Sequence, residues 1–430
     1  MRILIGADTY APHVNGASYF AQHLAGALTA RHEVHVAAPS DRFRSHTVRT
    51  PAGVIEHRVR SLPIPGHPGF RFCPPWGPRP SPAQSPSPAQ SPSPAHGRSP
   101  GSGPRPGSRT GWSLRDEAAR ILDEVRPDVV HVQSHFPLCR ALIEAARERG
   151  LFVVATNHFM PENLLHYLPI GRAGRASVHD WAWRQAAEVF AAADIVTAPT
   201  PYAATLATVS GITGPVLPIS CGIDLARFRT AAPSADFRRA FGLSAKPVIT
   251  YVGRLDAEKH VDVLIHSFAL IQQSTGAKLL LVGKGAEQQA LSDLAADLGV
   301  ADHVVFTGFL PDEDLPSAYA ATTVFVNAGT AELQSLVTLE AMASGRPVIG
   351  ADAAALPHLV INDETGYLFP PGDVTALAGH LRTVLDNPVH AAALGRRARE
   401  VAEQHDVTRT VAAFEQLYTI RHPAAESIAA

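Results

Sequence analysis

Residues 327–350, NAGTAELQSLVTLEAMASGRPVIG, decide the fold, because they leave one buried strand and lead into the next. The run 322–326 before them is β-branched and aromatic, which is typical of a strand. A short loop follows, and a helix is predicted to begin near Gln334 or Ser335 and to run to Ala343. Gly345 ends that helix, because glycine readily takes the left-handed conformation. The next strand begins at Pro347, so the stretch predicts a strand, a helix and a strand.

Two acids in this stretch, Glu332 and Glu340, stand eight positions apart, the first in the loop and the second on the helix. A helix that follows a parallel strand presents free N–H groups at the carboxyl edge of the sheet, where α/β proteins bind ligands. Such a site suits a phosphate or a diphosphate. Each carboxylate has two acceptor oxygens and can grip hydroxyls, as on a sugar and a ribose. Taken alone, both acids fit solvated surface equally well.

Length and composition limit the class of protein. The chain has 430 residues, which allows two domains, and a net charge of −2, which gives no basic field for nucleic acid. The three cysteines, Cys73, Cys139 and Cys221, show no metal or redox spacing, which fits a reducing cytoplasm. Residues 1–12 read as a strand and a loop rather than a signal peptide, and no run of about 20 apolar residues occurs. We therefore expect a cytoplasmic protein.

A second stretch of interest follows the predicted strand 248–253 and reads GRLDAEK from Gly253 to Lys259. Arg254 and Lys259 emerge together before a predicted helix at 261–274. Two cations in that place can neutralise a diphosphate, and the alternative is an exposed basic loop. Gly283 opens a Gly-Lys-Gly turn after another strand, but the rest of a dinucleotide fingerprint is absent.

The first half alternates between strands and helices, with strands at 1–7 and 33–38 around a helix at 17–30, which predicts a parallel sheet. Asn157 and His158 follow the predicted strand 152–156, and His135 follows the strand 127–132. These side chains are therefore expected at the carboxyl edge of the sheet. The chain contains 21 histidines, so a single one carries little weight by itself.

Residues 73–111 are dominated by Pro, Ser, Gly and Ala and contain a repeated QSPSPA. They lack the apolar content needed to fold and are predicted to be a disordered or polyproline-like insertion in a surface loop. A proline-rich motif that binds a partner is the alternative.

Residues 163–193 are expected to be helical, with two tryptophans and several arginines. The favoured interpretation is a core-facing tryptophan pair with a solvated arginine face, and the alternative is contact with an anionic lipid surface. The residues concerned are Trp181, Trp183, Arg172, Arg175 and Arg184.

The triplet Asp312-Glu313-Asp314 spells a D-x-D, a pattern that binds a metal ion in some other enzymes. Here it begins a predicted helix at 314–320, where acids serve as caps. We therefore expect no metal site in this triplet.

Taken together, these stretches resemble a known family. The spacing of Glu332 and Glu340, with the sequel LEAMASGRPVI, resembles the E-x7-E motif of retaining glycosyltransferases of family GT4, and the stretch from Gly253 to Lys259 resembles the family's G-R-L-x-x-E-K signature. The resemblance covers nearly the whole chain. One departure is Leu333-Gln334-Ser335, where the family often has Gly-Phe-Gly or Gly-Gly-like residues, and it bears on the choice of donor sugar.

The resemblance implies the GT-B fold, in which two Rossmann-like, doubly wound α/β domains face a cleft. It implies an acceptor-binding domain at 1–220 and a linker at 221–245. A nucleotide-sugar-binding domain would follow at 246–404, and a helix at 405–421 would return to the first domain.

The resemblance also implies roles for individual residues. His158, Arg254, Lys259 and Glu332 would be catalytic: the two cations stabilise the leaving diphosphate in place of a metal, Glu332 holds sugar hydroxyls, and His158 orients donor and acceptor. Glu340 would hold the ribose, Gly16 would let the first loop close over the diphosphate, and the backbone N–H groups of Leu336 and Val337 would lie near phosphate. Gly283 and Leu310 would border the base. The remaining candidates for substrate binding are His135, Asn157 and Gly253.

The function so implied is metal-independent transfer of a hexosyl group, mannose or glucose, from a nucleotide diphosphate sugar to an acceptor hydroxyl with retention and without a cofactor. GDP-mannose and UDP-glucose are the leading donors, by analogy. The acceptor is left open among a lipid, an inositol and a glycan, as is peripheral contact with the inner face of the membrane. The alternatives are a non-catalytic nucleotide-sugar-binding scaffold and a GT-B epimerase or phosphorylase.

Overall fold

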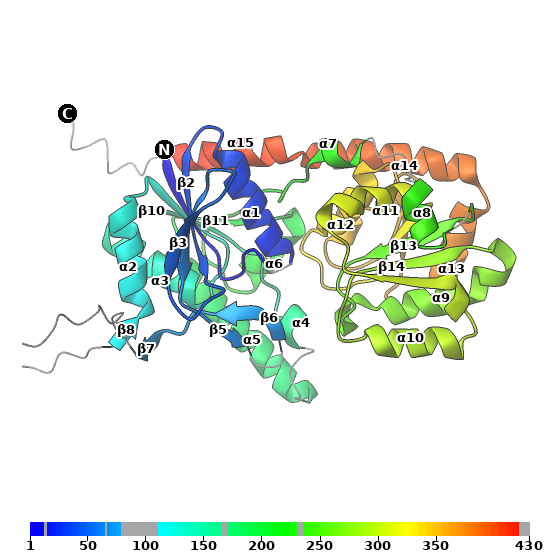
Figure 1. The fold of residues 1–430 in the computed structure, drawn as a ribbon, viewed down its shortest axis with the longest axis horizontal. Helices are drawn as coiled ribbons and strands as arrows, with labels where there is room; N and C mark the ends of the chain where they lie inside the picture. The colour runs from blue at the N-terminus through cyan, green and yellow to red at the C-terminus, as the bar shows by residue number, and fades with distance from the viewer. Residues whose placement is uncertain are drawn as a thin grey trace, which may run out of the picture.

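The computed structural model describes residues 1–12, 15–64, 67–78, 111–165, 171–229, 235–243 and 245–420. Within these ranges the chain forms two α/β halves that lie side by side (Figure 1). Each half is built on its own sheet.

The first sheet has eight strands within the described residues, in the order β12-β11-β10-β9-β1-β2-β4-β3. All neighbours are parallel except β3 and β4. The strands are β1 (Arg2–Gly6), β2 (Glu33–Pro39), β3 (His46–Arg49), β4 (Ile55–Val59), β9 (Val129–Val132), β10 (Phe152–Thr156), β11 (Ile195–Ala198) and β12 (Val216–Pro218). The helices of this half are α1 (Gly16–Leu28), α2 (Leu114–Val125), α3 (Pro137–Glu148), α4 (Glu162–Leu165), α5 (Arg172–Phe190) and α6 (Pro201–Val209).

The second sheet has six described strands, all parallel, in the order β15-β14-β13-β16-β17-β18. They are β13 (Val248–Val252), β14 (Lys278–Val282), β15 (Val304–Gly308), β16 (Val324–Asn327), β17 (Val348–Ala351) and β18 (Gly366–Phe369). The helices that follow the first half are α7 (Leu225–Phe228), α8 (Ala235–Ala240), α9 (Val261–Thr275), α10 (Gln288–Asp297), α11 (Leu315–Ala321), α12 (Leu336–Ala343), α13 (Val374–Leu385), α14 (Pro388–Ala402) and α15 (Val407–Thr419).

Both faces of the second sheet are buried, as expected for parallel strands covered by helices. Along β14, Leu279 and Leu281 pack into one apolar cluster, whereas Leu280 and Val282 pack into the cluster on the opposite face. This explains why the strands of this half are almost continuously apolar.

The strand order reverses once in each sheet. β1 lies between β2 and β9, and β13 lies between β14 and β16. In an open parallel sheet the loops that diverge at such a reversal leave a crevice beyond the carboxyl ends of the strands. The fold therefore places the loops after β1 and β9, and those after β13 and β16, where a ligand can bind. These sheets confirm the predicted class of two doubly wound parallel sheets.

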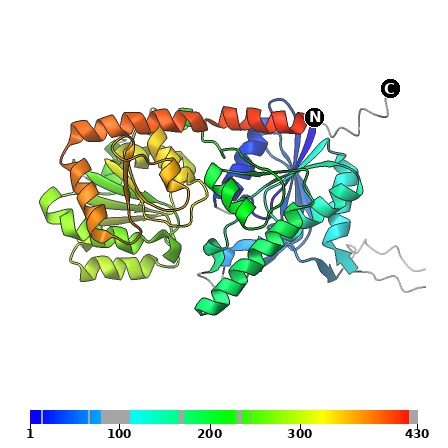
Figure 2. The ribbon, with the colours of Figure 1, turned by 180° about the vertical axis from the view of Figure 1, so that it is seen from behind.

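The last helix joins the two halves. α14 covers the second half, and α15 continues along the same side onto the first half (Figures 1 and 2). There the ring of Phe414 lies 5.9 Å from that of Phe20, and the Tyr418 hydroxyl lies 2.6 Å from Nδ1 of the buried His131. The domain boundaries expected from the sequence stay predictions.

The predicted tryptophan pair is wrong. Trp183 is buried, but Trp181 is 56% exposed, because the two side chains are two positions apart on α5 and point to different sides of the helix. The helix expected to run to residue 193 ends earlier, since α5 ends at Phe190. Residues 166–170 and the side chain of Arg172 lie outside the described residues.

The insertion expected at 73–111 is partly ordered. Strand β7 (Trp76–Pro78) pairs with β8 (Gly111–Ser113), and β5 (Leu62–Ile64) pairs with β6 (His67–Phe72) just before them. Cys73 is fully buried, so the ordered structure extends into the predicted insertion. The repeated QSPSPA lies outside the described residues.

The acids at 312–314 form a short 3-10 turn before α11, but they do not cap it by side-chain hydrogen bonds. Instead the Asp312 carboxylate pairs with Arg227 at 3.3 Å, which corrects the predicted capping role. No cluster of three or more potential metal-binding side chains occurs in the part of the chain that the structure describes.

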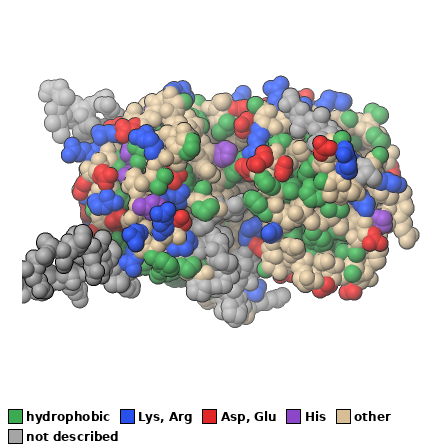
Figure 3. Space-filling view, in the orientation of Figure 1, with side chains coloured by type: hydrophobic (Ala, Val, Ile, Leu, Met, Phe, Trp, Pro, Cys, Tyr) green, Lys and Arg blue, Asp and Glu red, His purple; other side chains and the backbone are tan. Residues whose placement is uncertain are grey.

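Charges of both signs are mixed over the face drawn in Figure 3. None of the described helices combines the length and the apolar run that crossing a bilayer requires.

Candidate active site

A cleft of about 1760 Å³ lies between the halves and is lined by loops from the carboxyl ends of both sheets. It contains almost every residue that the sequence singles out: Gly16, His135, His158, Gly253, Arg254, Lys259, Gly283, Leu310, Glu332, Leu336, Val337 and Glu340. Residues separated by up to about three quarters of the chain thus meet in one place, as the strand order requires.

Asn157 does not line this cleft. Its side chain is fully buried, its amide nitrogen donates to the Phe159 carbonyl at 3.3 Å, and its amide oxygen accepts from the Phe159 N–H at 3.1 Å. The residue shapes the turn that presents His158, which does not support its predicted role in substrate binding.

Lys259 and Glu332 form an ion pair across the cleft floor. Nζ of Lys259 lies 2.7 Å from Oε1 of Glu332, and both side chains are only 15% exposed. The loop that carries Glu332 is held by Asn327, whose side chain accepts from the Gly329 N–H at 3.0 Å and donates to the Ser335 hydroxyl at 2.9 Å. The carboxylate is therefore fixed before any ligand binds.

Ser335 marks the start of α12. Its backbone is left-handed, with φ of 69°, which is rare for a residue other than glycine. The turn places Leu336 and Val337 in the first turn of the helix, where their N–H groups have no partner within it. The strain at Ser335 accompanies the abrupt change from loop to helix at the mouth of the cleft.

Arg254 lies at the edge of the same cleft and pairs with the carboxylates of Asp256 and Glu258, the latter at 2.7 Å. Both acids are buried, whereas the Arg254 side chain is 33% exposed. The guanidinium is thus oriented by its own loop and keeps one side open to the cleft. The sequence places both acids near Arg254 but does not indicate this orienting role.

Glu340 lies in the second turn of α12 and is almost completely buried. Its Oε2 accepts a hydrogen bond of 2.7 Å from the hydroxyl of Tyr319. Burial raises the pKa of Glu340 to about 7, and the hydrogen bond from Tyr319 opposes that rise. Tyr319 was missed by sequence reasoning, since nothing local in α11 indicates that it will face α12.

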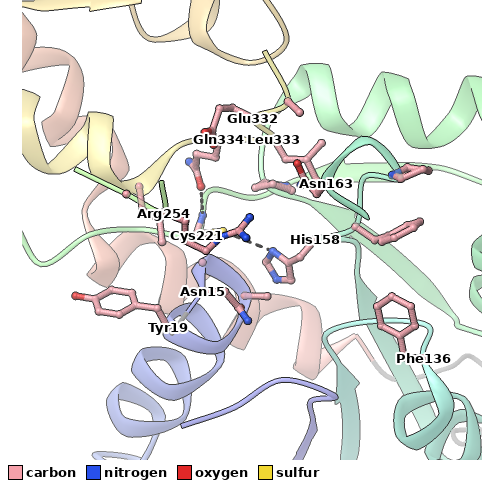
Figure 4. Close-up of a pocket in the computed structure, with 18 of the residues that line it drawn as sticks. Asn15, Tyr19, Phe136, His158, Asn163, Cys221, Arg254, Glu332, Leu333 and Gln334 are labelled. Atoms are coloured by element: carbon pink, nitrogen blue, oxygen red, sulfur yellow. Dashed lines mark hydrogen bonds between the residues drawn. The ribbon is translucent and has the colours of Figure 1, made fainter. Parts of the chain in front are cut away.

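His158 lies on the wall opposite Glu332. Its Nδ1 lies 4.0 Å from the sulfur of Cys221 (Figure 4). Its Nε2 lies 2.9 Å from the amide oxygen of Gln133, and its ring packs 5.0 Å from that of Phe20. Burial lowers the pKa of His158 to about 4, so the imidazole is neutral at pH 7. With the Gln133 oxygen as acceptor, Nε2 carries the proton and Nδ1 keeps its lone pair.

His135 occupies a different environment from His158. Its ring lies 4.4 Å from that of Phe136, 4.7 Å from Phe159 and 5.8 Å from Phe190, measured between centroids. Burial lowers its pKa to about 4 as well, and Nδ1 has no hydrogen-bond partner among the described residues. His135 therefore marks an aromatic part of the cleft.

Two glycines fix the loops after β13 and β14. The φ of Gly283 is 132°, and a Cβ built on it would lie 1.9 Å from the Gly253 carbonyl oxygen. Any side chain at Gly283 would push the loop of Arg254 away. Packing between the loops thus accounts for the Gly-Lys-Gly turn, which fits the absence of a dinucleotide fingerprint.

The loop of Glu332 also touches the first half of the chain. Ala331 and Leu333 pack in an apolar cluster with Met160 and Ala198, and the Thr200 hydroxyl donates to the Leu333 carbonyl at 2.8 Å. The loop that carries Glu332 is therefore part of the contact between the halves. Sequence reasoning missed this contact because it joins positions more than a hundred residues apart.

Solved structures resemble this fold over nearly the whole chain. They include an Anabaena protein solved with UDP and glucose, with a TM-score of 0.73 and 19% identity over 97% of this chain and 99% of that one. A sucrose-phosphate synthase from Thermosynechococcus elongatus has a TM-score of 0.72 and 22% identity over 96% of this chain and 98% of that one. At these identities the likeness establishes the GT-B fold alone.

Curated proteins show sequence similarity as well. A GDP-mannose-dependent alpha-mannosyltransferase from Mycolicibacterium smegmatis is 30% identical over 86% of this chain and 84% of its own length. A protein of the same name from Mycobacterium tuberculosis is 33% identical over 59% of this chain, and the sulfoquinovosyl transferase SQD2 of Arabidopsis thaliana is 28% identical over 67% of it. The matches span only 63% and 56% of those two relatives.

Two family models match successive parts of the chain. The model described as "Glycosyltransferase Family 4" matches residues 72–227, and the model described as "Glycosyl transferases group 1" matches residues 234–401. These matches confirm the resemblance inferred from Glu332, Glu340 and the stretch after Gly253. The chain belongs to glycosyltransferase family 4.

Proposed function

We propose that the chain transfers a hexosyl group, mannose or glucose, from a nucleotide diphosphate sugar to an acceptor hydroxyl, with retention and without a metal. The observation that carries the proposal is the Lys259–Glu332 pair beside Arg254 at the N-terminus of α12. It brings two cations and free helical N–H groups together with a carboxylate that can hold sugar hydroxyls.

The leaving diphosphate would be bound by Arg254, Lys259 and the N–H groups of Leu336 and Val337. A helix N-terminus and two cations favour an anion electrostatically, and in a partly buried cleft each donor is worth more than in water. Removing one preorganised donor of this kind typically costs about 3–4 kcal/mol in the barrier. Gly16 supports the same assignment, since a Cβ built on it would meet no atom of the described residues within 4 Å, which leaves room for phosphate.

Glu332 would accept hydrogen bonds from the hydroxyls of the transferred sugar, with Lys259 holding the carboxylate in place. Glu340 would hold the ribose. Because its pKa lies near neutrality, Glu340 passes between a purely accepting carboxylate and a carboxyl that also donates. Gly283 and Leu310 would border the base.

His158 would orient the acceptor and the donor sugar. As a neutral imidazole it can accept a hydrogen bond from a hydroxyl at Nδ1 without adding charge near the reacting carbon. In the reaction, the bond from the anomeric carbon to the phosphate oxygen breaks and the bond to the acceptor oxygen forms. The acceptor's proton passes to the leaving phosphate. Without a covalent intermediate, retention requires the acceptor to attack on the face that the phosphate leaves.

The donor and acceptor are suggested by relatives. The mannosyltransferases named above are GDP-mannose-dependent, and the Anabaena structure holds UDP and glucose. Other relatives are named as a phosphatidylinositol monomannoside mannosyltransferase and an alpha-monoglucosyldiacylglycerol synthase. We therefore propose GDP-mannose or UDP-glucose as donor, a lipid, inositol or glycan acceptor, and a cytoplasmic location at the inner face of the membrane.

The proposal is tested by release of nucleoside diphosphate from GDP-mannose and UDP-glucose in the presence of EDTA, with an extract of membrane lipids and soluble glycans as acceptors. The anomeric configuration of the product is read by NMR. Lys259→Met should abolish release, whereas Arg120→Met, which removes an exposed cation on α2, should not. Nucleotide binding without turnover would instead favour the non-catalytic scaffold, and an inverted product would contradict retention.

A further inference from the structure

Beyond His158 the cleft extends into the first half, where its lining becomes mainly apolar and aromatic. Its walls there are formed by α3 and α5, and the lining residues on each helix repeat at helical spacing. On α5 they are Val178, Trp181, Ala182, Gln185 and Val189, and on α3 they are Pro137, Arg140, Ala141 and Glu144. Positions three and four apart share one face of a helix, so one stripe of each helix lines this extension.

The stripe of α5 is mainly apolar. Trp181 is 56% exposed, although a large aromatic side chain normally gains by burial. Val178 is partly exposed one turn earlier, and Val189 is buried at the far end of the stripe. Trp181 therefore presents an apolar surface to the cleft that no described residue covers completely.

The floor between the two helices is aromatic. The rings of Phe136 and Phe159 lie 5.6 Å apart nearly edge to face, and Phe159 contacts Trp183 at 6.0 Å. Phe159 follows His158 directly in the chain, so this floor begins beside the proposed reaction centre. The His135 imidazole lies among the same rings.

The charged members of the α3 stripe are already paired. Arg140 contacts Glu188 at 2.7 Å and Glu144 at 3.4 Å. The contact with Glu188 joins α3 to α5, so it ties together the two walls. These charges stabilise the walls and leave the aromatic floor and Trp181 as the surface for a ligand.

We infer that this extension, between α3 and α5 over Phe136 and Phe159, is a subsite for a hydrocarbon chain carried by the acceptor. The inference rests on the proposed function, because it is the continuity with His158 and Glu332 in one cleft that identifies the occupant as acceptor. The acceptor would place its hydroxyl at His158 and lay its chain along Val178 and Trp181. A small hydrophilic acceptor would leave this surface uncovered.

Matched glycosides test the subsite directly. We would compare octyl and methyl β-glucoside by calorimetry, with the octyl compound below its micellar concentration and the nucleoside diphosphate present. Burial of each methylene strengthens binding roughly threefold to fourfold, so two buried methylenes already give about tenfold tighter binding of the octyl compound, and further ones give more. The expected result is a preference of tenfold or more.

Two variants assign that preference to the walls. Trp181→Ala and Val178→Asp should each reduce the octyl preference at least fivefold while leaving methyl glucoside binding and thermal stabilisation by nucleotide unchanged. Leu270→Ala, which removes an apolar side chain 64% exposed on α9, should leave the preference intact. If nucleotide still raises the thermal stability of a variant, that variant is folded.

Equal binding of the two glycosides, or a preference that survives in both variants, would overturn the subsite while nucleotide stabilisation persists. A failure of the proposed function is distinguishable, because it would appear in the unmodified protein as the absence of nucleotide stabilisation or as nucleotide binding without turnover. That result would remove the acceptor assignment as well.

Discussion

The side chain of Gln334 joins the loop of Glu332 to the point where the chain leaves the first sheet. Its Oε1 accepts a hydrogen bond of 2.8 Å from the backbone N–H of Cys221 (Figure 4). Its Nε2 donates to the Ser220 hydroxyl at 2.7 Å. Ser220 in turn lies 2.9 Å from Nδ1 of His405, in the segment that leads to α15. The Gln334 side chain, from the loop of Glu332, thus links the two places where the chain passes between the halves, one at Ser220 and Cys221 and the other near His405.

This arrangement predicts that Gln334→Leu weakens activity by loosening the contact between the halves. The change leaves the Cys221 N–H without its partner, which costs about 1–3 kcal/mol, and it removes one of the partners of the Ser220 hydroxyl, which keeps His405 and the Gly222 N–H. We expect a lower kcat, because Glu332 and His158 no longer meet in a fixed geometry. Nucleotide affinity should change little, since Arg254 and Lys259 remain. Steady-state kinetics and small-angle scattering measure the two effects.

Thr200→Val provides a matched comparison for that prediction, because it removes a further hydrogen bond between the first half and this loop. An unchanged kcat in both variants would show that the loop is positioned without these contacts.

The Lys259–Glu332 pair predicts strong coupling between its two members. Lys259→Met leaves a carboxylate with little exposure and no partner, and breaking a buried pair in this way costs about 3–5 kcal/mol, less here because some exposure remains. Adding Glu332→Gln should recover stability but not activity. Urea unfolding of the single and double variants measures the coupling, and additive losses would show that the pair is not a unit.

The raised pKa of Glu340 predicts a pH-dependent effect on stability. The folded protein binds a proton more tightly at Glu340 than the unfolded chain does, whose carboxyl has a pKa of 4.5. Stability is therefore lost as pH rises from about 4.5 to about 7, and it is constant above that range with respect to this group.

Glu340→Gln removes this titration. Its free energy of unfolding, relative to the unmodified protein, should rise between pH 5 and pH 7.5 by up to about 3 kcal/mol. Urea unfolding at the two pH values checks the difference. If the difference in free energy of unfolding between the two proteins does not change with pH, the surroundings stabilise the Glu340 carboxylate. The hydroxyl of Tyr319 is the first candidate for that role.

The close approach of two loops predicts that Gly283→Ala separates them. The added Cβ collides with the Gly253 carbonyl and requires an unfavourable backbone conformation. We expect a loss of stability and of nucleotide affinity, because the loop of Arg254 must move. Gly379→Ala in α13 is the control: no protein atom lies within 4 Å of its added Cβ, and alanine favours a helix by about 1 kcal/mol. Equal nucleotide affinity in both variants would contradict the prediction.

The local parts of the site could be predicted because they lie within one strand, loop and helix. The apolar run before Asn327 indicated a strand, and Gly345 indicated the end of the helix that the structure assigns to Leu336–Ala343. Glu332 and Glu340 were found from their spacing. Their contacts with Tyr319 and Lys259 were not predicted, because those two side chains reach them from other elements.

The predictions that proved wrong also failed because of contacts between different elements. Asp312 was expected to cap its own helix, but Arg227 lies close enough in the fold to pair with it. Trp181 and Trp183 were expected to share the core, yet their positions on α5 separate them. A sequence pattern describes one element at a time, whereas these outcomes depend on which elements pack together.

Binding of nucleoside diphosphate by Arg254 and Lys259 is the central claim, and thermal stabilisation tests it most directly. GDP, UDP and ADP would be added to the purified protein without metal, and a ligand at a hundredfold excess over its dissociation constant should stabilise the fold by about 2.7 kcal/mol. The account predicts a shift with one of these nucleotides that disappears in Arg254→Ala and in Lys259→Ala and persists in Arg120→Ala. No shift with any nucleotide, or a shift that requires a divalent metal, would contradict it.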